Sequence, residues 1–536
     1  MASPYRLFRH HTDPGPYLLN SEEITRSAGE VEGQRPAISD FSCARPPRLS
    51  CRYDDAAYSA VSSTATPSSS DQPSPPLLSP DTPVSATPDK LARVRPTDAP
   101  LRLRNTVQTY DWGAYDAIPR LLGAEPDGTP HAELWLGAHP SAPSRAYPAG
   151  DPADPASGDG APSPAGARDS AGRPGDPVPS GDPVADDGVT LHALIRSAPD
   201  AMLGKRVADE FGPRLPYLLK VLAARRALSL QVHPKPHTAR EGFNRENRLG
   251  LPAGSPKRSF HDDQHKPEML VALTQFEGLA GLRGTRAALS LLDGLGGKLV
   301  DDVVGALRAD RSATGMRAAF DVLIRARQDT GCRADIERTV DSVRERLAAG
   351  SPFERADRTV VDLADQHPGD PGAIASLLMN RFTLEPGEAL FTPAGELHAY
   401  LSGVGVEVMA SSDNVLRAGL TSKLVDATAL VECASFAARP PVLPEVATSG
   451  GRGQVQTYRA PVPEFALTLA DVDPSENVEL PDDGPRIVLC LDGETTLTCG
   501  NGATTRLARG ASAFVPDAAG ALTLTGTGHV VCAWVP

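Results

Sequence analysis

GEALFTPAGELH, at residues 387–398, sets two glycines, a proline and a histidine at fixed spacing in a strand-rich part of the chain. Gly387, Pro393 and Gly395 are residue types that shape tight turns, and His398 opens the strand that follows. An ordinary hairpin with an exposed histidine is the alternative, but the spacing matches at all four positions. The stretch therefore predicts a tight turn that leads into a strand beginning at His398.

The spacing G-x5-P-x-G-x2-H resembles the second signature of the cupin fold. A later segment, GASAFVP at 510–516, repeats G-x5-P but lacks the histidine. This internal echo indicates a second, metal-free copy of the fold. We therefore expect a mainly β chain with an α insertion, consisting of tandem cupin-like antiparallel β-barrels of the jelly-roll type plus a helical domain.

LSLQVHP, at 228–234, reads as a strand that carries polar side chains on one face. Because side chains alternate along a strand, Ser229, Gln231 and His233 project from one face and aliphatic side chains from the other. A solvent-facing surface strand would show the same pattern. The aliphatic run at 215–230 instead favours a strand buried on both faces. A buried glutamine and histidine need partners, and a metal ion is one way to supply them.

The segment HKPE, at 265–268, supplies a carboxylate, Glu268. His261 and His265 form a rival pair with the i, i+4 spacing of a helical metal site. Pro267 disfavours helix just before it, so this pair is rejected. His265 and its neighbour Lys266 become candidates for binding substrate, with ion pairing at the rim as the alternative.

Two imidazoles, one carboxylate and one amide oxygen or water suit Zn²⁺, although Mn²⁺, Fe²⁺ or Co²⁺ also bind N/O sites of this kind. The predicted ligands are Gln231, His233, Glu268 and His398. A dense group of ionisable residues follows at 407–423 and includes Glu407, Asp413 and Arg417. A polar surface loop would also fit this group, but its position after the His398 strand favours a role in facing substrate.

The formal net charge of −14 argues against a general nucleic-acid or anionic-membrane binder. No apolar run reaches the roughly 20 residues needed to span a bilayer, and the N-terminus lacks the apolar core of a secretory signal. Seven scattered cysteines without a C-x-x-C pair fit reduced thiols. We expect a cytoplasmic protein with neither nucleic acid nor a membrane as partner.

Six stretches, taken in order, resemble type I mannose-6-phosphate isomerases. They cover most of residues 101–430, and six together are far more specific than any one of them. The stretches are NTVQTYDWG (105–113), HAELWLGAHPSAPS (131–144), LPYLLKVLAARRALSLQVHP (215–234), HKPEM with FEGLAGLR (265–269 and 276–283), GELHAYLSG (395–403) and EVMASSDNVLRAGLTSK (407–423).

The resemblance implies a zinc enzyme that interconverts D-mannose 6-phosphate and D-fructose 6-phosphate and so feeds GDP-mannose synthesis. It implies one Zn²⁺ per chain on the four ligands named above and a catalytic arginine at Arg417. It also implies substrate-site residues at Lys220, His265, Lys266, Glu407 and Asp413, beside which we expect Ser229 to bind substrate. The expected partner is a small sugar phosphate, and we expect a monomer.

Such an isomerisation moves a proton between C2 and C1 through a cis-enediol(ate). It needs a base near a weakly acidic C–H and positive charge near the developing oxyanion. We expect the metal to position the sugar or polarise O1 and O2, and Arg417 to stabilise the enediolate. Glu407 is the preferred proton carrier, with Lys266 and His265 as competitors.

The composition of the chain gives the domain boundaries. Residues 1–98 and 149–187 are rich in proline and small polar residues, so we expect a disordered N-terminal extension and a disordered insertion. Apolar residues at helical spacing predict a helical domain at 285–375. The catalytic cupin domain is then 99–284 with 376–440. The metal-free cupin-like domain is 450–536, with ALTLTG and HVVCAWVP as separate short strands.

Three other readings fit parts of the sequence. One is a non-catalytic sugar-binding cupin, but all four ligands and Arg417 are present. Another is an isomerase for a different sugar phosphate. The third is a mononuclear iron or manganese dioxygenase, which more typically combines two or three histidines with a carboxylate and needs no lysine-rich pocket.

Overall fold

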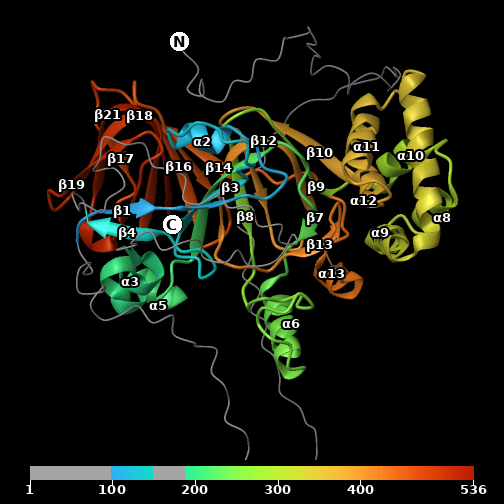
Figure 1. Ribbon diagram of the computed structural model, residues 1–536, viewed down its shortest axis with the longest axis horizontal. Coiled ribbons are helices and arrows are strands. Elements are labelled where there is room, and N and C mark those ends of the chain that lie inside the picture. Colours follow the sequence, from blue (N-terminus) through green and yellow to red (C-terminus); the bar gives the residue numbers. More distant parts are fainter. Residues whose placement is uncertain (1–97, 149–187, 424) are drawn as a thin grey trace, which may run out of the picture. The chain divides into compact units, whose positions relative to one another are not determined.

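Strand β12 (His398–Ala410) links the parts of the first sheet (Figure 1). It pairs antiparallel with β6 (Tyr217–Ala224), β7 (Leu230–Val232), β8 (Glu268–Ala272) and β9 (Phe276–Leu282). One strand can serve four partners because β12 is 13 residues long, more than twice the usual strand length of about 5–6 residues. It therefore brings together side chains from distant parts of the sequence.

The computed structural model describes residues 98–148, 188–423 and 425–536. The two segments predicted to be disordered, 1–98 and 149–187, lie outside these ranges, apart from Asp98. No helix in the described ranges is long and apolar enough to cross a membrane.

The first sheet has ten strands, six of them in the order β10-β9-β12-β6-β3-β2. Strands β7 and β8 also pair with β12; β7 pairs in turn with β13, and β8 pairs with β11. Its other strands are β2 (Thr106–Gln108), β3 (Glu133–Gly137), β10 (Met379–Leu384), β11 (Ala389–Thr392) and β13 (Leu416–Gly419).

The second sheet has eleven strands, in the order β14-β15-β16-β21-β18-β20-β1-β4-β5, with β17 paired to β21 and β19 to β18. Three of them come from the N-terminal part of the described chain: β1 pairs with β20, with Leu101 opposite Phe514. The predicted domain boundaries stay a prediction. The pairing shows in addition that β1, β4 and β5, from the N-terminal part of the described chain, join the sheet formed mainly by the C-terminal strands. The strands are β1 (Leu101–Arg104), β4 (Arg145–Pro148), β5 (Val189–Thr190), β14 (Glu445–Ser449), β15 (Val455–Arg459), β16 (Ala466–Val472), β17 (Val478–Leu480), β18 (Arg486–Cys499), β19 (Thr504–Ala508), β20 (Ser512–Val515) and β21 (Leu522–Trp534).

The two longest helices, α9 and α10, follow one another between β9 and β10, and Figure 1 shows α8 to α11 grouped beside that edge of the first sheet. The helices are α2 (Ala117–Leu121), α3 (Leu191–Ser197), α4 (Pro199–Leu203), α5 (Lys205–Phe211), α6 (Pro236–Arg248), α7 (Thr285–Leu292), α8 (Lys298–Ala309), α9 (Ala313–Gln328), α10 (Arg333–Ala348), α11 (Glu354–Gln366), α12 (Gly372–Ala375) and α13 (Ala427–Cys433).

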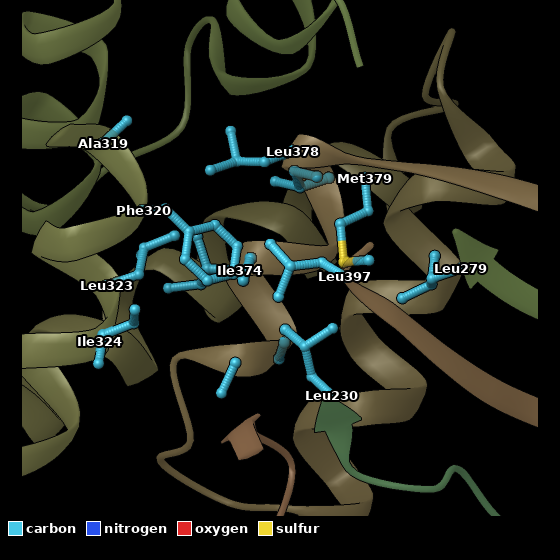
Figure 2. Close-up of a cluster of buried hydrophobic side chains, with 14 of the residues drawn as sticks. Leu230, Leu279, Ala319, Phe320, Leu323, Ile324, Ile374, Leu378, Met379 and Leu397 are labelled. Atoms are coloured by element: carbon cyan, nitrogen blue, oxygen red, sulfur yellow. The ribbon is translucent and has the colours of Figure 1, made fainter. Parts of the chain in front are cut away.

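An apolar core joins these helices to the strands that carry the candidate site. Phe320 of α9 is 1 % exposed and belongs to the same cluster as Leu230 of β7 and Leu397, which precedes His398. Figure 2 shows these side chains gathered between the helices and the strands. Burying a large apolar side chain contributes about 1.5–3 kcal/mol to stability. The helices therefore stabilise the ends of the strands that carry the candidate site.

A second apolar cluster joins the two sheets. It contains Leu219 and Val221 of β6 together with Ile487, Phe514 and Val531 of the second sheet. The alternation of β6 explains this cluster, because the odd-numbered residues of β6 face this core and Lys220 faces the other side.

The two antiparallel sheets and the helices between β9 and β10 confirm the predicted fold class, mainly β with tandem cupin-like sheets and a helical insertion.

One predicted detail of the second sheet is wrong. ALTLTG and HVVCAWVP belong to the single strand β21 and are not separate strands. The glycines between them suggested a turn, but Gly526 lies opposite Thr495 of β18. A Cβ atom on Gly526, whose φ is +114°, would lie 2.5 Å from the Glu494 carbonyl oxygen. This glycine allows two strands to approach closely.

Candidate metal centre and active site

Three buried side chains, His233, Glu268 and His398, bring potential ligand atoms within 4.8 Å of one another. His233 Nε2 lies 3.1 Å from Glu268 Oε1, and His398 Nε2 lies 3.3 Å from Glu268 Oε2. His233 follows β7, Glu268 begins β8 and His398 begins β12. The three ends of neighbouring strands thus meet at one point.

The turn of the G-x5-P-x-G-x2-H stretch positions His398 beside His233. The backbone N–H of Gly395 donates to the His233 carbonyl oxygen at 2.8 Å. Gly395 has φ of +90°, which favours glycine, and a Cβ atom there would lie 2.9 Å from Lys235 Cε. Three residues after Gly395, His398 pairs with Gln231 in register.

Both histidine rings are oriented by backbone carbonyls. His233 Nδ1 lies 2.6 Å from the Asn414 carbonyl oxygen, and His398 Nδ1 lies 2.9 Å from that of Glu396. Since a carbonyl only accepts, each Nδ1 donates a proton, and each Nε2 is the ring atom that faces Glu268. This is the usual arrangement around metal-bound histidines.

The cluster has the donor atoms and the charge state that a divalent cation needs. Within the described ranges, His233 Nε2 and Glu268 Oε2 are buried without a hydrogen-bond partner. Burial lowers the pKa of His233 to about 4 despite the attraction of Glu268. Burial opposes ionisation of Glu268, but His233 and Lys266 outweigh it and hold its pKa well below the usual range. A neutral imidazole and an ionised carboxylate fit a bound metal.

Gln231 lies beside the three residues. Its Nε2 atom is 3.3 Å from His398 Nε2, and a 180° rotation of the amide would present Oε1 at the same place. Its role as fourth ligand stays a prediction. Ser229 is half-buried and lies one residue before β7, and its predicted contact with substrate also stays untested.

Lys266 and His265, which are adjacent in sequence, have different surroundings. The Lys266 ammonium lies 3.3 Å from Glu268 Oε1, directly against the candidate ligand set. His265 Nε2 pairs instead with Glu464, which precedes β16 of the second sheet. Lys266 therefore lies at the cluster, whereas His265 is held by a residue from the other sheet.

Glu407 is a buried residue of β12. Strict alternation along β12 would place its side chain on the face of the sheet opposite to that of His398. The register of β12 against β9 shifts between Tyr400 and Ser402, and such an irregularity changes which face later residues occupy. Burial raises the pKa of Glu407. The positive charge of Lys220 lowers this pKa, and the negative charge of Glu268 raises it further.

Lys220 lies between two buried carboxylates. Its Nζ is 3.1 Å from Glu407 Oε2 and 3.4 Å from Glu133 Oε1. Burial disfavours the charged ammonium, but Glu133 and Glu407 outweigh it and raise the pKa of Lys220. The indole N–H of Trp135 donates to the other oxygen of Glu133 at 2.7 Å.

Arg417 of β13 pairs in register with Gln231, which places it next to the metal cluster. No carboxylate pairs with its guanidinium in the part of the chain that the structure describes. Burial lowers the pKa of Arg417, and Tyr110 partly offsets this. Tyr110 is 40 % exposed overall, but partial burial, followed by the effect of Glu133, raises the pKa of its hydroxyl to about 12. Tyr110 therefore also faces this site.

Asp413 is half-exposed and lies at the edge of the site. His139 Nε2 is 3.5 Å from its Oδ1, and the Ser141 hydroxyl donates to its Oδ2 at 2.9 Å. The next residue, Asn414, is fully buried and bonds the loop at 261–264. Its side chain accepts from the backbone N–H of His261 and donates to the carbonyl oxygen of Gln264.

The sequence analysis missed several residues of this site: Tyr110, Glu133, Trp135, His139 and Asn414. A usable signal was present for Glu133, which stands in the apolar stretch HAELWLG. A carboxylate on a buried strand needs a cationic partner. Asn414 could not have been found in this way, because its role depends on a loop distant in sequence.

Known proteins match this chain along most of its length. The family model "Phosphomannose isomerase type I, catalytic domain" matches residues 101–150 and 178–285. The model "Mannose-6-phosphate isomerase, cupin domain" matches residues 454–535. The first match contains the strands with His233 and Glu268, and the second contains most of the second sheet.

Mannose-6-phosphate isomerase of Escherichia coli is 33% identical over 434 residues, which is 80% of this chain and 98% of the relative. Mannose-6-phosphate isomerase 1 of Arabidopsis thaliana is 31% identical over 73% of this chain and 84% of its own length. A crystal structure of a mutant phosphomannose isomerase from Salmonella typhimurium matches with a TM-score of 0.67 and 30% identity, over 82% of this chain and 99% of the other. A zinc-bound mannose 6-phosphate isomerase structure has a TM-score of 0.66, with the same identity and coverage. The chain belongs to the type I phosphomannose isomerase family.

Proposed function

We propose that this chain is a zinc-dependent isomerase that interconverts D-mannose 6-phosphate and D-fructose 6-phosphate through a cis-enediol(ate). The observation that carries the proposal is the buried cluster of His233, Glu268 and His398 next to the Glu407–Lys220 ion pair. Relatives named mannose-6-phosphate isomerase share about a third of their residues with this chain. The metal cluster and the ion pair supply the two things that the reaction needs, a cation and a proton carrier.

Zinc is the proposed metal, held by His233, Glu268, His398 and Gln231, with one ion per chain. The donor set of two imidazole nitrogens, a carboxylate and an amide oxygen suits it, and a structural relative has zinc bound. When bound, the ion would supply Lewis-acid polarisation to the sugar oxygens.

Glu407 is the proposed proton carrier between C2 and C1. Its raised pKa brings it closer to the working pH, where a carboxylate exchanges protons more effectively. Lys266 and His265 remain competitors, and Lys266 is the stronger one because its ammonium lies at the cluster. Arg417, without a carboxylate partner among the described residues, would stabilise negative charge on the enediolate.

The remaining proposed roles concern substrate binding. Lys220, Ser229, His265 and Asp413 would contact the sugar phosphate, and Lys220 lies in the site beside Glu407. We also propose that the protein acts in the cytoplasm as a monomer and supplies mannose 6-phosphate for GDP-mannose. The acidic net charge of −14 favours a soluble protein that binds neither nucleic acid nor anionic membranes.

A direct assay tests this function against the alternatives. Purified protein is incubated separately with mannose 6-phosphate, glucose 6-phosphate and ribose 5-phosphate, and the ketose phosphate that each would form is measured: fructose 6-phosphate from the two hexose phosphates and ribulose 5-phosphate from the pentose phosphate. The proposal predicts turnover of mannose 6-phosphate well above that of the other two. Preference for another sugar phosphate would indicate the alternative isomerase, and binding without turnover would indicate a sugar-binding cupin.

A further inference from the structure

Three adjacent strands place a carboxylate, an ammonium and a second carboxylate in one row. Lys220 of β6 lies directly opposite Glu407 of β12 on one side and Trp135 of β3 on the other. Glu133 precedes Trp135 by two residues, so both side chains project from the same face of β3. Glu133, Lys220 and Glu407 are 7 %, 5 % and 2 % exposed.

The position of the Lys220 ammonium depends on both carboxylates. A lysine side chain has four rotatable bonds and a point charge that any nearby anion can draw aside. Glu407 attracts Nζ from one side at 3.1 Å and Glu133 from the other at 3.4 Å. The Trp135 ring lies 5.3 Å from Nζ and closes a third side.

Glu133 itself is fixed. The Trp135 indole N–H donates to Glu133 Oε2 at 2.7 Å, while Oε1 faces Lys220. Trp135 also packs edge-on against His139, with ring centroids 5.2 Å apart. Glu133 therefore cannot follow Lys220 if the ammonium moves, and it acts as a fixed anchor.

We propose that Glu133 is a positioning residue for the isomerisation: it holds the Lys220 ammonium, and through it the Glu407 carboxylate, in the geometry that proton transfer requires. Glu133 touches neither the metal cluster nor, in this proposal, the substrate. Its effect reaches the reaction only through Lys220. This inference rests on the proposed function, because it assigns Glu407 as the proton carrier.

A double-mutant cycle tests the proposal. Glu133→Gln keeps the size of the side chain and its bond to Trp135 but removes the charge. We expect it to lower kcat by about 10–100-fold, the range seen when a supporting partner of a site is lost, with KM changed less than about threefold. Because Glu133 acts through Lys220, the double variant Glu133→Gln/Lys220→Met should be no slower than Lys220→Met alone.

Several controls separate this role from a structural one. Zinc content of each variant should match that of the wild type, and each variant should stay folded at the assay temperature although the loss of a buried charge lowers its Tm. Glu277→Gln serves as a matched control. Glu277 pairs with Arg381 and Arg355 away from the site, so kcat should not change. If Glu133→Gln does not fold, Trp135→Phe replaces it, since it removes the indole N–H that fixes Glu133 while keeping an aromatic ring, and should also lose kcat.

The outcomes are distinct. Single effects of Glu133→Gln and Lys220→Met that multiply in the double variant would overturn the inference, as would an unchanged kcat for Glu133→Gln. Either result with an active wild-type enzyme leaves the isomerase function intact. An inactive, zinc-loaded wild type would instead contradict the proposed function.

Discussion

His233 Nδ1 lies 2.6 Å from the carbonyl oxygen of Asn414. The same asparagine uses its side chain to hold the loop at 261–264, which leads into Lys266 and Glu268. One buried residue thus orients one candidate ligand and supports the segment before another. The metal cluster depends on this connection as much as on the ligands themselves.

Asn414→Ala keeps the backbone carbonyl that orients His233 but removes the side-chain hydrogen bonds that hold the loop before Glu268, and it is expected to weaken zinc binding about 10–100-fold, as loss of an outer support of a metal site does. The free energy of unfolding should also fall by about 1–3 kcal/mol, because buried loop groups lose their partners. Competition with a chromophoric chelator and urea denaturation measure the two effects. Asn244→Ala, at an exposed position of α6, is the control, and zinc affinity equal to the wild type in Asn414→Ala would contradict the account.

Glu407→Gln is expected to lower kcat by about 10²–10³-fold, because the amide cannot carry a proton between C2 and C1. Zinc content should stay at one ion per chain, since Glu407 lies outside the predicted ligand set. Steady-state turnover of mannose 6-phosphate and metal analysis give both values. Near-normal turnover would exclude Glu407 and move the role to Lys266 or His265.

Arg417→Lys keeps the positive charge but loses the planar guanidinium, whose donors are fixed in direction. Removing an oriented oxyanion donor costs about 10²–10³-fold in kcat, and we expect a loss within this range. KM should change less than kcat if Arg417 acts mainly in the transition state. A variant with raised KM and unchanged kcat would show that Arg417 only binds the substrate.

Acid should destabilise the protein partly through His139. Burial lowers the pKa of His139 to about 4, and Asp413 only partly offsets this, whereas an unfolded histidine has a pKa of about 6.5. The unfolded state therefore binds the proton first, and this contribution to stability is present above pH 6.5 and is lost as pH falls toward 4.

His139→Gln removes this titration, so the Tm difference between wild type and variant should shrink as pH falls from 7 to about 4.5. Differential scanning calorimetry on both proteins measures it. His237→Gln, at an exposed position of α6, should leave the difference constant. A constant difference for His139→Gln as well would contradict this, because it would mean that the His139 ring binds its proton at the same pH in the folded and unfolded states.

The sequence predicted the fold class because its strongest signals are local. The turn residues Gly387, Pro393 and Gly395 and the alternation around Gln231 act over a few residues, and helical periodicity identifies the inserted helices. Glycine was misleading only at Gly526, where the same residue type that ends strands allows β18 and β21 to pair closely.

The site was only partly predictable for a related reason. Motif spacing and family resemblance pointed to His233, Glu268 and His398, which the structure brings together, but their role as ligands stays a prediction. Glu133 and Asn414 act through partners 87 and 152 residues away. A carboxylate in the apolar stretch HAELWLG was a local signal for Glu133, but no local pattern reveals its partner or the role of Asn414. The engagement of His265 by Glu464 from the second sheet was equally hidden.

Zinc reconstitution tests the central claim most directly. The purified enzyme is freed of metal with a chelator and titrated with Zn²⁺ while formation of fructose 6-phosphate from mannose 6-phosphate is measured. We predict no turnover without metal, full recovery at one Zn²⁺ per chain, and no recovery in His398→Ala. Full turnover by the metal-free protein, or no recovery of the wild type with Zn²⁺, would contradict the account.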